Sequence, residues 1–157
     1  MKTRNNNKNI TIMVLTILFG LFVVIVIQTS AMAGNAKAIR FNQLPLSAQT
    51  VVNSHFDQKL ISLTMSDGFM FKDYDVFFKD GDKIEFNSNG QWTGVECFSS
   101  RVPSFFIPQA IETYIKKNYP KSAIQKIRKD HGLTDVKLAN GTGISFNGRY
   151  QVIDIED

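Results

Sequence analysis

Two segments of the chain carry apolar side chains at the three- and four-residue spacing of an amphipathic helix. Behind Pro108 the apolar stripe consists of Ile111, Tyr114, Ile115 and Tyr119. Behind Pro45 it consists of Ala48, Val51, Val52, His55 and Phe56. Proline suits the first turn of a helix because the N–H that it lacks has no helical partner there. The pattern therefore predicts one helix after each proline, with Pro120 ending the second.

Short runs of β-branched and aromatic residues, bounded by Gly, Asn and Asp, follow each predicted helix. The predicted strands are 60–65, 69–79, 83–87 and 91–97 in the first half and 123–130, 133–139, 143–147 and 149–155 in the second. Tight turns at Asp80-Gly81 and Asn140-Gly141 favour antiparallel hairpins. The predicted fold class is α+β, a tandem repeat of two modules that each pack one helix on a four-stranded antiparallel sheet.

The two halves also resemble each other in sequence. Leu44-Pro45 corresponds to Ile107-Pro108 at an offset of 63, and the run from Asp75 to Asn87 corresponds to that from Asp135 to Asn147 at an offset of 60. Gly90-Gln-Trp92 matches Gly148-Arg-Tyr150 at an offset of 58. We interpret the shrinking offset as a loss of residues in turns, where deletions are tolerated. The predicted modules are 41–97 and 102–157, which together form one domain.

Alternation along the strands separates an inner from an outer face. If Tyr74, Val76 and Phe78 face the helix, then Asp73, Asp75 and Phe77 face away from it. The second half has the same pattern, with apolar residues at 136 and 138 and charged residues at 135 and 137. The sheet face without a helix is therefore mixed polar and aromatic, and is available to a partner.

The N-terminus has the order of a secretory signal peptide. Lys2, Arg4 and Lys8 precede an uncharged apolar run over 10–27, and Ala31-Met-Ala33 supplies small residues for signal peptidase. The sequence predicts a signal peptide over 1–33, cleaved after Ala33, and therefore a periplasmic or secreted protein without a stable membrane span. An uncleaved anchor is the alternative, because the apolar run is about as long as the shortest membrane-spanning helices.

Removal of this segment changes the charge of the chain. The full sequence has 18 basic and 14 acidic residues, and three basic residues leave with the signal, so the remainder is 15 − 14 = +1. The basic character thus belongs mainly to the targeting segment, and no nucleic-acid partner is expected. The remaining charge is uneven: 41–97 has four basic and eight acidic residues, and 102–157 has eight and six.

Few residues could support catalysis. The only histidines are His55 and His131, the only cysteine is Cys97, and neither histidine has a counterpart in the other half. Nothing in the sequence places a nucleophile beside a base, so we predict no catalytic residue and no enzyme activity. A single cysteine cannot form a disulfide within the chain, and we expect Cys97 to be a partly buried thiol; pairing with another chain is the alternative.

The stretch KDGDKIEFNSNGQW at 79–92 has the oxygen-rich composition of a calcium loop. Its echo, ANGTGISFNGRY at 139–150, keeps the turn and core residues but not the acids, so both stretches are predicted to form hairpins. Calcium also requires several oxygens at defined positions, which Ile84 and Phe86 interrupt. The remaining metal candidates are the acidic residues Asp73, Asp75, Asp80 and Asp82. No other cofactor is expected.

With a signal peptide before two copies of Leu/Ile-Pro, helix, strand and an Asp-Val…Asp/Asn-Gly…Ile-x-Phe-Asn motif, the sequence resembles PepSY-like, beta-lactamase-inhibitor-like periplasmic proteins of Bacteroidetes over 41–157. The resemblance implies two adjacent helix-plus-four-strand modules, whose open sheet face clasps a secreted enzyme in the inhibitors. Those inhibitors have a disulfide in each module, which this chain lacks, and no contact residue matches. Inhibition of a beta-lactamase is therefore not carried over, although regulation of an exported enzyme remains a theme of the family.

The function that we expect is non-enzymatic binding of an exported protein or peptide through the open sheet face. The predicted binding residues are Asp73, Asp75, Phe77, Phe98 and Arg101. Phe105 and Phe106 either join this surface or pack the two modules together. The alternative function is a periplasmic sensor that responds to calcium or binds a small ligand.

Overall fold

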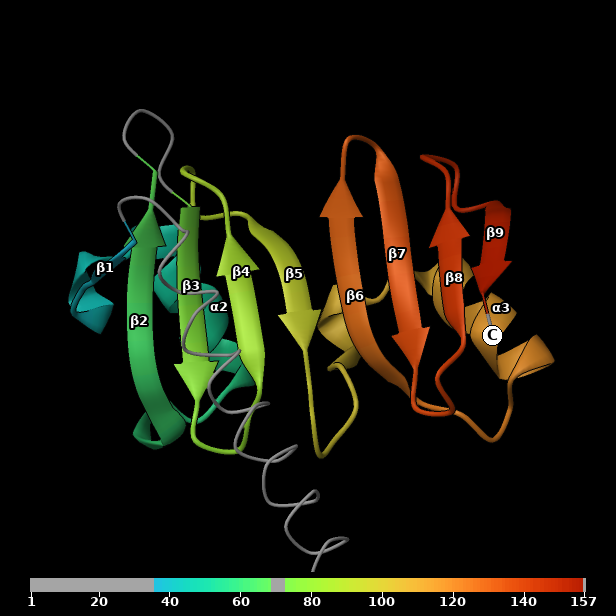
Figure 1. Ribbon diagram of the computed structural model, residues 1–157, viewed down its shortest axis with the longest axis horizontal. Coiled ribbons are helices and arrows are strands. Elements are labelled where there is room, and N and C mark those ends of the chain that lie inside the picture. The colour runs from blue at the N-terminus through green and yellow to red at the C-terminus, as the bar shows by residue number, and fades with distance from the viewer. Residues whose placement is uncertain (1–35, 69–72, 157) are drawn as a thin grey trace, which may run out of the picture. The chain divides into compact units, whose positions relative to one another are not determined.

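A single antiparallel sheet of nine strands runs through the part of the chain that the computed structural model describes, residues 36–68 and 73–156. The predicted signal peptide, 1–33, lies outside these residues. The strands follow one another in the sheet in the order of the sequence, as Figure 1 shows. They are β1 (Lys37–Ala38), β2 (Ile61–Asp67), β3 (Asp73–Phe78), β4 (Lys83–Phe86), β5 (Trp92–Glu96), β6 (Ile124–Asp130), β7 (Leu133–Leu138), β8 (Gly143–Phe146) and β9 (Val152–Glu156).

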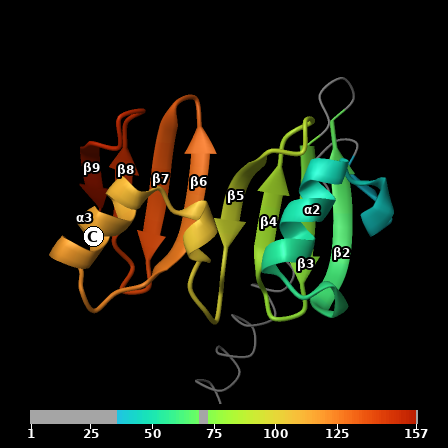
Figure 2. The ribbon, with the colours of Figure 1, turned by 180° about the vertical axis from the view of Figure 1, so that it is seen from behind.

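Two α-helices, α2 (Leu46–His55) and α3 (Gln109–Asn118), cover the same face of the sheet (Figure 2). Three short 3-10 helices, η1 (Phe41–Gln43), η2 (Gln58–Leu60) and η3 (Ser104–Phe106), flank them. Pro45 and Pro108 lie one residue before the helices, and their carbonyls accept bonds from Gln49 N and Glu112 N, each at 3.0 Å. The order of one helix and four strands, repeated twice, confirms the predicted α+β class. The two-residue β1 is an addition that the sequence pattern did not predict.

The strand registers correct the alignment of the two repeats. β2 and β6 share an offset of 63, and every later strand pair shares an offset of 60. The change in offset from 63 to 60 therefore arises between the second and third strands of each repeat. The β2–β3 connection spans residues 68–72, whereas the β6–β7 connection consists of His131 and Gly132 alone. Phe86 pairs with Trp92 and Phe146 with Val152, so Trp92 corresponds to Val152. The proposed match of Trp92 with Tyr150 is wrong, because it followed residue similarity rather than register.

The apolar core lies between the sheet and the two helices. In β3 the side chains of Val76 and Phe78 are buried, and in β7 those of Val136 and Leu138 are buried. From the helices, Ala48 and Val52 of α2 and Ile111 and Ile115 of α3 pack against them. This alternation confirms the predicted inner face, and it leaves the charged positions of β3 and β7 on the opposite side.

The two repeats meet at the pair β5–β6, where Gly94, Val95 and Glu96 lie opposite Arg128, Ile127 and Lys126. On the helix side of this seam Phe106 of η3 is buried, and its ring contacts those of Trp92 and His55 at centroid distances of 5.3 and 5.4 Å. Phe105 stacks on His55 at 4.1 Å and stays 59% exposed. The two phenylalanines were expected either to join the binding surface or to pack the modules together, and Phe106 packs the modules together.

Candidate functional site

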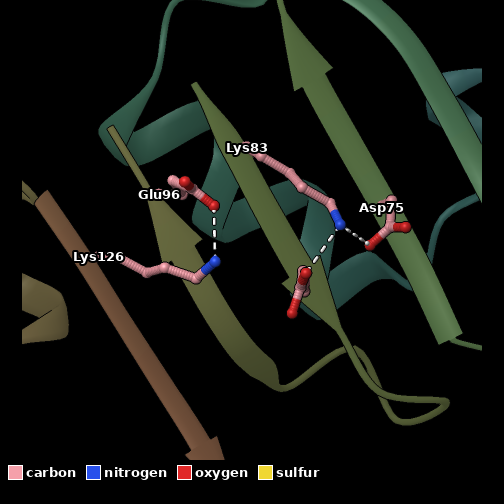
Figure 3. Close-up of polar contacts among 5 residues, drawn as sticks. Asp75, Lys83, Glu96 and Lys126 are labelled. Atoms are coloured by element: carbon pink, nitrogen blue, oxygen red, sulfur yellow. Dashed lines mark hydrogen bonds and ion pairs between the residues drawn. The ribbon is translucent and has the colours of Figure 1, made fainter. Parts of the chain in front are cut away.

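The helix-free sheet face carries a row of paired charges, which we call the charge ladder: Asp75 of β3, Lys83 and Glu85 of β4, Glu96 of β5 and Lys126 of β6 (Figure 3). Lys83 Nζ lies 3.4 Å from Asp75 Oδ1 and 2.7 Å from Glu85 Oε1. Lys126 Nζ lies 2.9 Å from Glu96 Oε2, so this ion pair crosses the seam between the repeats. The cross-strand register brings these residues together, because charged positions directly opposite one another lie within reach.

Partial burial makes the charges around Lys83 interdependent. Burial opposes the charge of Lys83, but the bond to Glu85 and the charge of Asp75 outweigh it and raise the pKa of Lys83. Burial also favours the neutral form of Glu85, yet the bond from Lys83 and the nearby basic side chains hold the pKa of Glu85 below its usual value. For Asp75 the effect of burial wins, so the pKa of Asp75 is raised despite Lys83. Lys83 therefore remains a cation between two carboxyl groups that differ in acidity.

Gly94, at the centre of the sheet, has no side chain on this face, and the carboxylate of Glu85 occupies the space. A Cβ added to Gly94 would lie only 2.5 Å from Glu85 Oε2, so the carboxylate of Glu85 rests over the glycine backbone. Beside it a groove of about 370 Å³ is lined mainly by Asp67, Asp73, Asp75, Lys83, Glu85 and Arg128. The site is thus shallow and highly charged, which suits a polar protein or peptide surface better than an apolar small molecule.

The structure brings only part of the predicted binding set together. Asp73 and Asp75 line the acidic groove, and Phe77 lies next to Lys83, whose Nζ is 5.2 Å from the centre of the Phe77 ring. Phe98 is 77% exposed but lies against the turn at Gly81, after the end of β3. Arg101 lines a different groove, together with residues of α3. The first three predicted residues therefore share the helix-free face, and Arg101 does not join them.

The four acidic residues considered for calcium fall into two separate pairs. Asp73 and Asp75 begin β3, whereas Asp80 and Asp82 lie in the turn that follows its other end. Asp82 is 7% exposed and its Oδ1 accepts a bond from Phe98 N at 2.9 Å, so this carboxylate stabilises the turn. Within residues 36–68 and 73–156, no group of three or more His, Cys, Asp or Glu side chains has an arrangement that could hold a metal ion.

Each residue considered for catalysis has structural surroundings of its own. Cys97 is buried, and burial together with the negative charge of Asp82 raises the pKa of its thiol to about 12. His55 is part of the aromatic cluster at the seam, while His131 occupies the β6–β7 turn and contacts Asp130. The thiol is therefore protonated at neutral pH, and the side chains that act on it electrostatically are Asp82, Ser100 and Asp80.

The basic members of the site, Lys83 and Lys126, were not among the predicted binding residues. Lys83 pairs with Phe77 and with Glu96 across the sheet, and Lys126 also pairs with Glu96. The alternation in KIE (83–85) placed Lys83 and Glu85 on the same face as Asp75, and this signal was available. The ion pair between Glu96 and Lys126 could not be predicted from the sequence, because no local pattern indicates that β5 pairs with β6.

Neither helix in residues 36–68 and 73–156 has the length and apolar character needed to cross a bilayer.

Comparison with known proteins places this chain in a family. Residues 72–154, more than half of the chain, match the family described as "Putative beta-lactamase-inhibitor-like, PepSY-like". Among the curated proteins no match to the chain is found.

Three solved structures share the fold over most of their length. A "putative periplasmic protein" from Bacteroides vulgatus is 40% identical (TM-score 0.76), covering 80% of this chain and 99% of its own. A "putative calcium-regulated periplasmic protein" from Bacteroides thetaiotaomicron is 36% identical (TM-score 0.76), with the same coverage. A third, a "putative periplasmic protein of unknown function" from Bacteroides vulgatus, is 32% identical (TM-score 0.73), covering 78% of this chain and all of its own. The chain belongs to the PepSY-like, beta-lactamase-inhibitor-like family.

Proposed function

We propose that the protein is a non-enzymatic exported binding module, which contacts another exported protein through the helix-free sheet face. The observation that carries this proposal is the charge ladder, which lies on the face opposite α2 and α3 and spans both repeats. Export is supported by the signal-peptide pattern and by relatives described as periplasmic. Regulation of an exported enzyme agrees with the family, and the ladder itself favours no particular enzyme class.

The charges give the surface a direction. Its first-repeat end is acidic, with Asp67, Asp73 and Asp75 around one groove. Its second-repeat end is lined by three basic residues, Lys126, Arg128 and Lys137, and by two acidic ones, Asp135 and Glu156, so the basic residues are in the majority there. A partner with the opposite order of charges would bind in one orientation, because charge complementarity across an interface fixes register and excludes wrong partners. Phe77 supplies an aromatic contact beside the acidic end.

The test is cross-linking and affinity capture from a periplasmic extract, with identification of the bound proteins by mass spectrometry. The face variants are Phe77→Ala and Lys126→Glu, and Lys117→Glu on the exposed side of α3 is the matched control. We expect one partner to be recovered with the unmodified protein and the control, and at least tenfold less of it with either face variant. Equal recovery with all four proteins would contradict the use of this face.

A calcium-responsive function is the second candidate, and one observation favours it. Asp67, Asp73 and Asp75 line the same groove, although they are not arranged as a metal site in the structure, and the relative described as calcium-regulated is 36% identical over 80% of this chain. Carboxylate oxygens are preferred calcium ligands. Titration with calcium chloride in a calorimeter tests this function, with Asp73→Asn as the site variant and Asp154→Asn as the control. No heat and an unchanged melting temperature in the unmodified protein would eliminate it.

A further inference from the structure

The outer edge of β9 is an open strand edge. β9 pairs with β8, and no other strand of residues 36–68 and 73–156 pairs with it (Figure 1). Ile153 and Ile155 of this strand are 53% and 44% exposed. An exposed edge with apolar side chains and free backbone groups is a template for pairing with another extended segment.

The internal repeat shows what such an edge accepts. β9 stands in the second repeat where β5 stands in the first, because both follow the preceding strand with the same register and the same irregularity. Asp154, Ile155 and Glu156 therefore correspond to Gly94, Val95 and Glu96. In the first repeat those positions pair with Arg128, Ile127 and Lys126 of β6, and that pairing leaves Val95 only 1% exposed.

The pairing of β5 with β6 also shows which way the backbone N–H and C=O groups of β9 point. Cys97 N donates to Gln125 O at 2.8 Å, so the backbone N–H of Cys97 faces β6. Bonded pairs alternate along an antiparallel ladder, which means that the N–H and C=O of Val95 also face β6. By the equivalence of the repeats, the N–H and C=O of Ile155 face away from β8, toward the open edge.

The charges of the edge select its occupant. β9 presents two carboxylates, Asp154 and Glu156, where β5 presents only Glu96, which is paired with Lys126 at 2.9 Å. We propose that the β9 edge binds an extended segment of another protein with alternating basic and apolar residues, as in Lys126-Ile127-Arg128, added as an antiparallel strand. The basic residues would lie opposite the two acids and the apolar residue opposite Ile155.

A second copy of the chain is a poorer occupant. Two β9 strands paired with each other would bring four carboxylates together, since Asp154 and Glu156 are the exposed acids of each edge, and like charges at that distance repel. The other edge strand of the sheet is β1, whose two residues, Lys37 and Ala38, pair with Ser66 and Met65 of β2 and offer a second copy little backbone to pair with. The proposal stands on the strand register and does not depend on the function of the helix-free face.

The test uses a synthetic peptide with the sequence of residues 123–130, AIQKIRKD, capped at both ends. Binding to the whole protein is measured by calorimetry, and amide hydrogen exchange locates the peptide. We expect saturable binding and slower exchange of the Ile155 amide. The double substitution Asp154→Lys and Glu156→Lys in the protein should weaken binding at least tenfold without changing the melting temperature. A peptide that carries both Lys126→Glu and Arg128→Glu should also bind at least tenfold more weakly. Glu112→Lys on α3 is the matched control and should leave binding unchanged.

Three results would overturn the proposal. The first is the absence of saturable binding up to millimolar peptide. The second is equal affinity for the protein and its double variant, since the acids would then play no part. The third is a dimer in sedimentation without peptide that the double variant abolishes, because the edge would then belong to a second copy.

Discussion

At the scale of single residues, the two repeats conserve turn chemistry and differ in buried polar chemistry. Asn87 Oδ1 accepts bonds from the backbone N–H groups of Asn89 and Gln91, each at 3.0 Å, and Asn147 forms the same pair with Arg149 and Gln151. Asp82, by contrast, corresponds to Thr142, although both are buried. Asp82 binds Phe98 N and lies beside Cys97, so the first repeat has an acidic residue buried against a thiol.

The thiol of Cys97 predicts a loss of stability at high pH. Its pKa is raised from 9.0 to about 12 in the folded protein, so folding favours the protonated thiol. The contribution is complete below pH 9 and is lost as the pH rises toward 12, by up to about 1.4 kcal/mol per pH unit. Chemical unfolding at pH 8 to 11 measures this slope. Cys97→Ala is the control and should show a shallower slope; equal slopes would contradict the raised pKa.

At the scale of elements, hairpins were the most predictable part of the fold. Alternation and turn residues are local, so the sequence indicated β3–β4, β4–β5, β7–β8 and β8–β9 close to their observed limits. Tyr150 shows where local rules fail. Its φ is 59°, and it occupies the position of Gly90, whose φ is 72°. Because the two residue types differ, the sequence alignment set Gly148 opposite Gly90 instead of Tyr150. The two-residue β1 has too short a pattern to be detected.

The turn between β4 and β5 also positions helix α2. Ser47 Oγ donates to Asn89 O at 2.9 Å, and a Cβ added to Gly90 would lie 2.7 Å from Pro45 Cβ. Gly141, in the β7–β8 turn, has a similar positive φ of 97° but no atom within 4 Å of an added Cβ. Glycine is thus needed at Gly90 for both backbone conformation and close approach, and at Gly141 for conformation alone.

Alanine at each glycine separates these two requirements. Gly141→Ala should cost about 1 kcal/mol of unfolding free energy, for the positive φ alone. Gly90→Ala should cost about 1–3 kcal/mol more, because the end of α2 must also move away from the turn. Urea unfolding of both variants measures the difference. Equal losses would show that α2 is not held against this turn.

At the scale of the whole molecule, the sequence predicts the two modules but not how they join. Repetition, helix stripes and strand alternation indicated two similar modules, and these signals lie within short windows. The continuous sheet depends on the pairing of β5 with β6, which are far apart along the chain, and on Phe106, whose ring contacts His55 and Trp92 of the first repeat. The Glu96–Lys126 pair of the charge ladder depends on the same pairing of β5 with β6. This part of the candidate site could therefore not be predicted from the sequence, for the same reason as the seam.

The seam should make the two repeats unfold as one unit, and the two adjacent phenylalanines test this. Phe106 is 1% exposed between Trp92 and His55, so Phe106→Ala removes a large buried ring and should cost about 3–5 kcal/mol. Phe105 is 59% exposed and stacks only on His55 and Phe106 among the ring pairs of the described residues, so Phe105→Ala should cost about 1 kcal/mol.

Trp92, the only tryptophan of the chain, reports on the seam by fluorescence, while circular dichroism reports on both repeats. In the unmodified protein the two signals should give the same midpoint in guanidinium, because a continuous sheet and a shared core leave no repeat able to unfold alone. Separate midpoints would show two independent units. Equal losses for the two alanine variants would contradict the packing role of Phe106 at the seam.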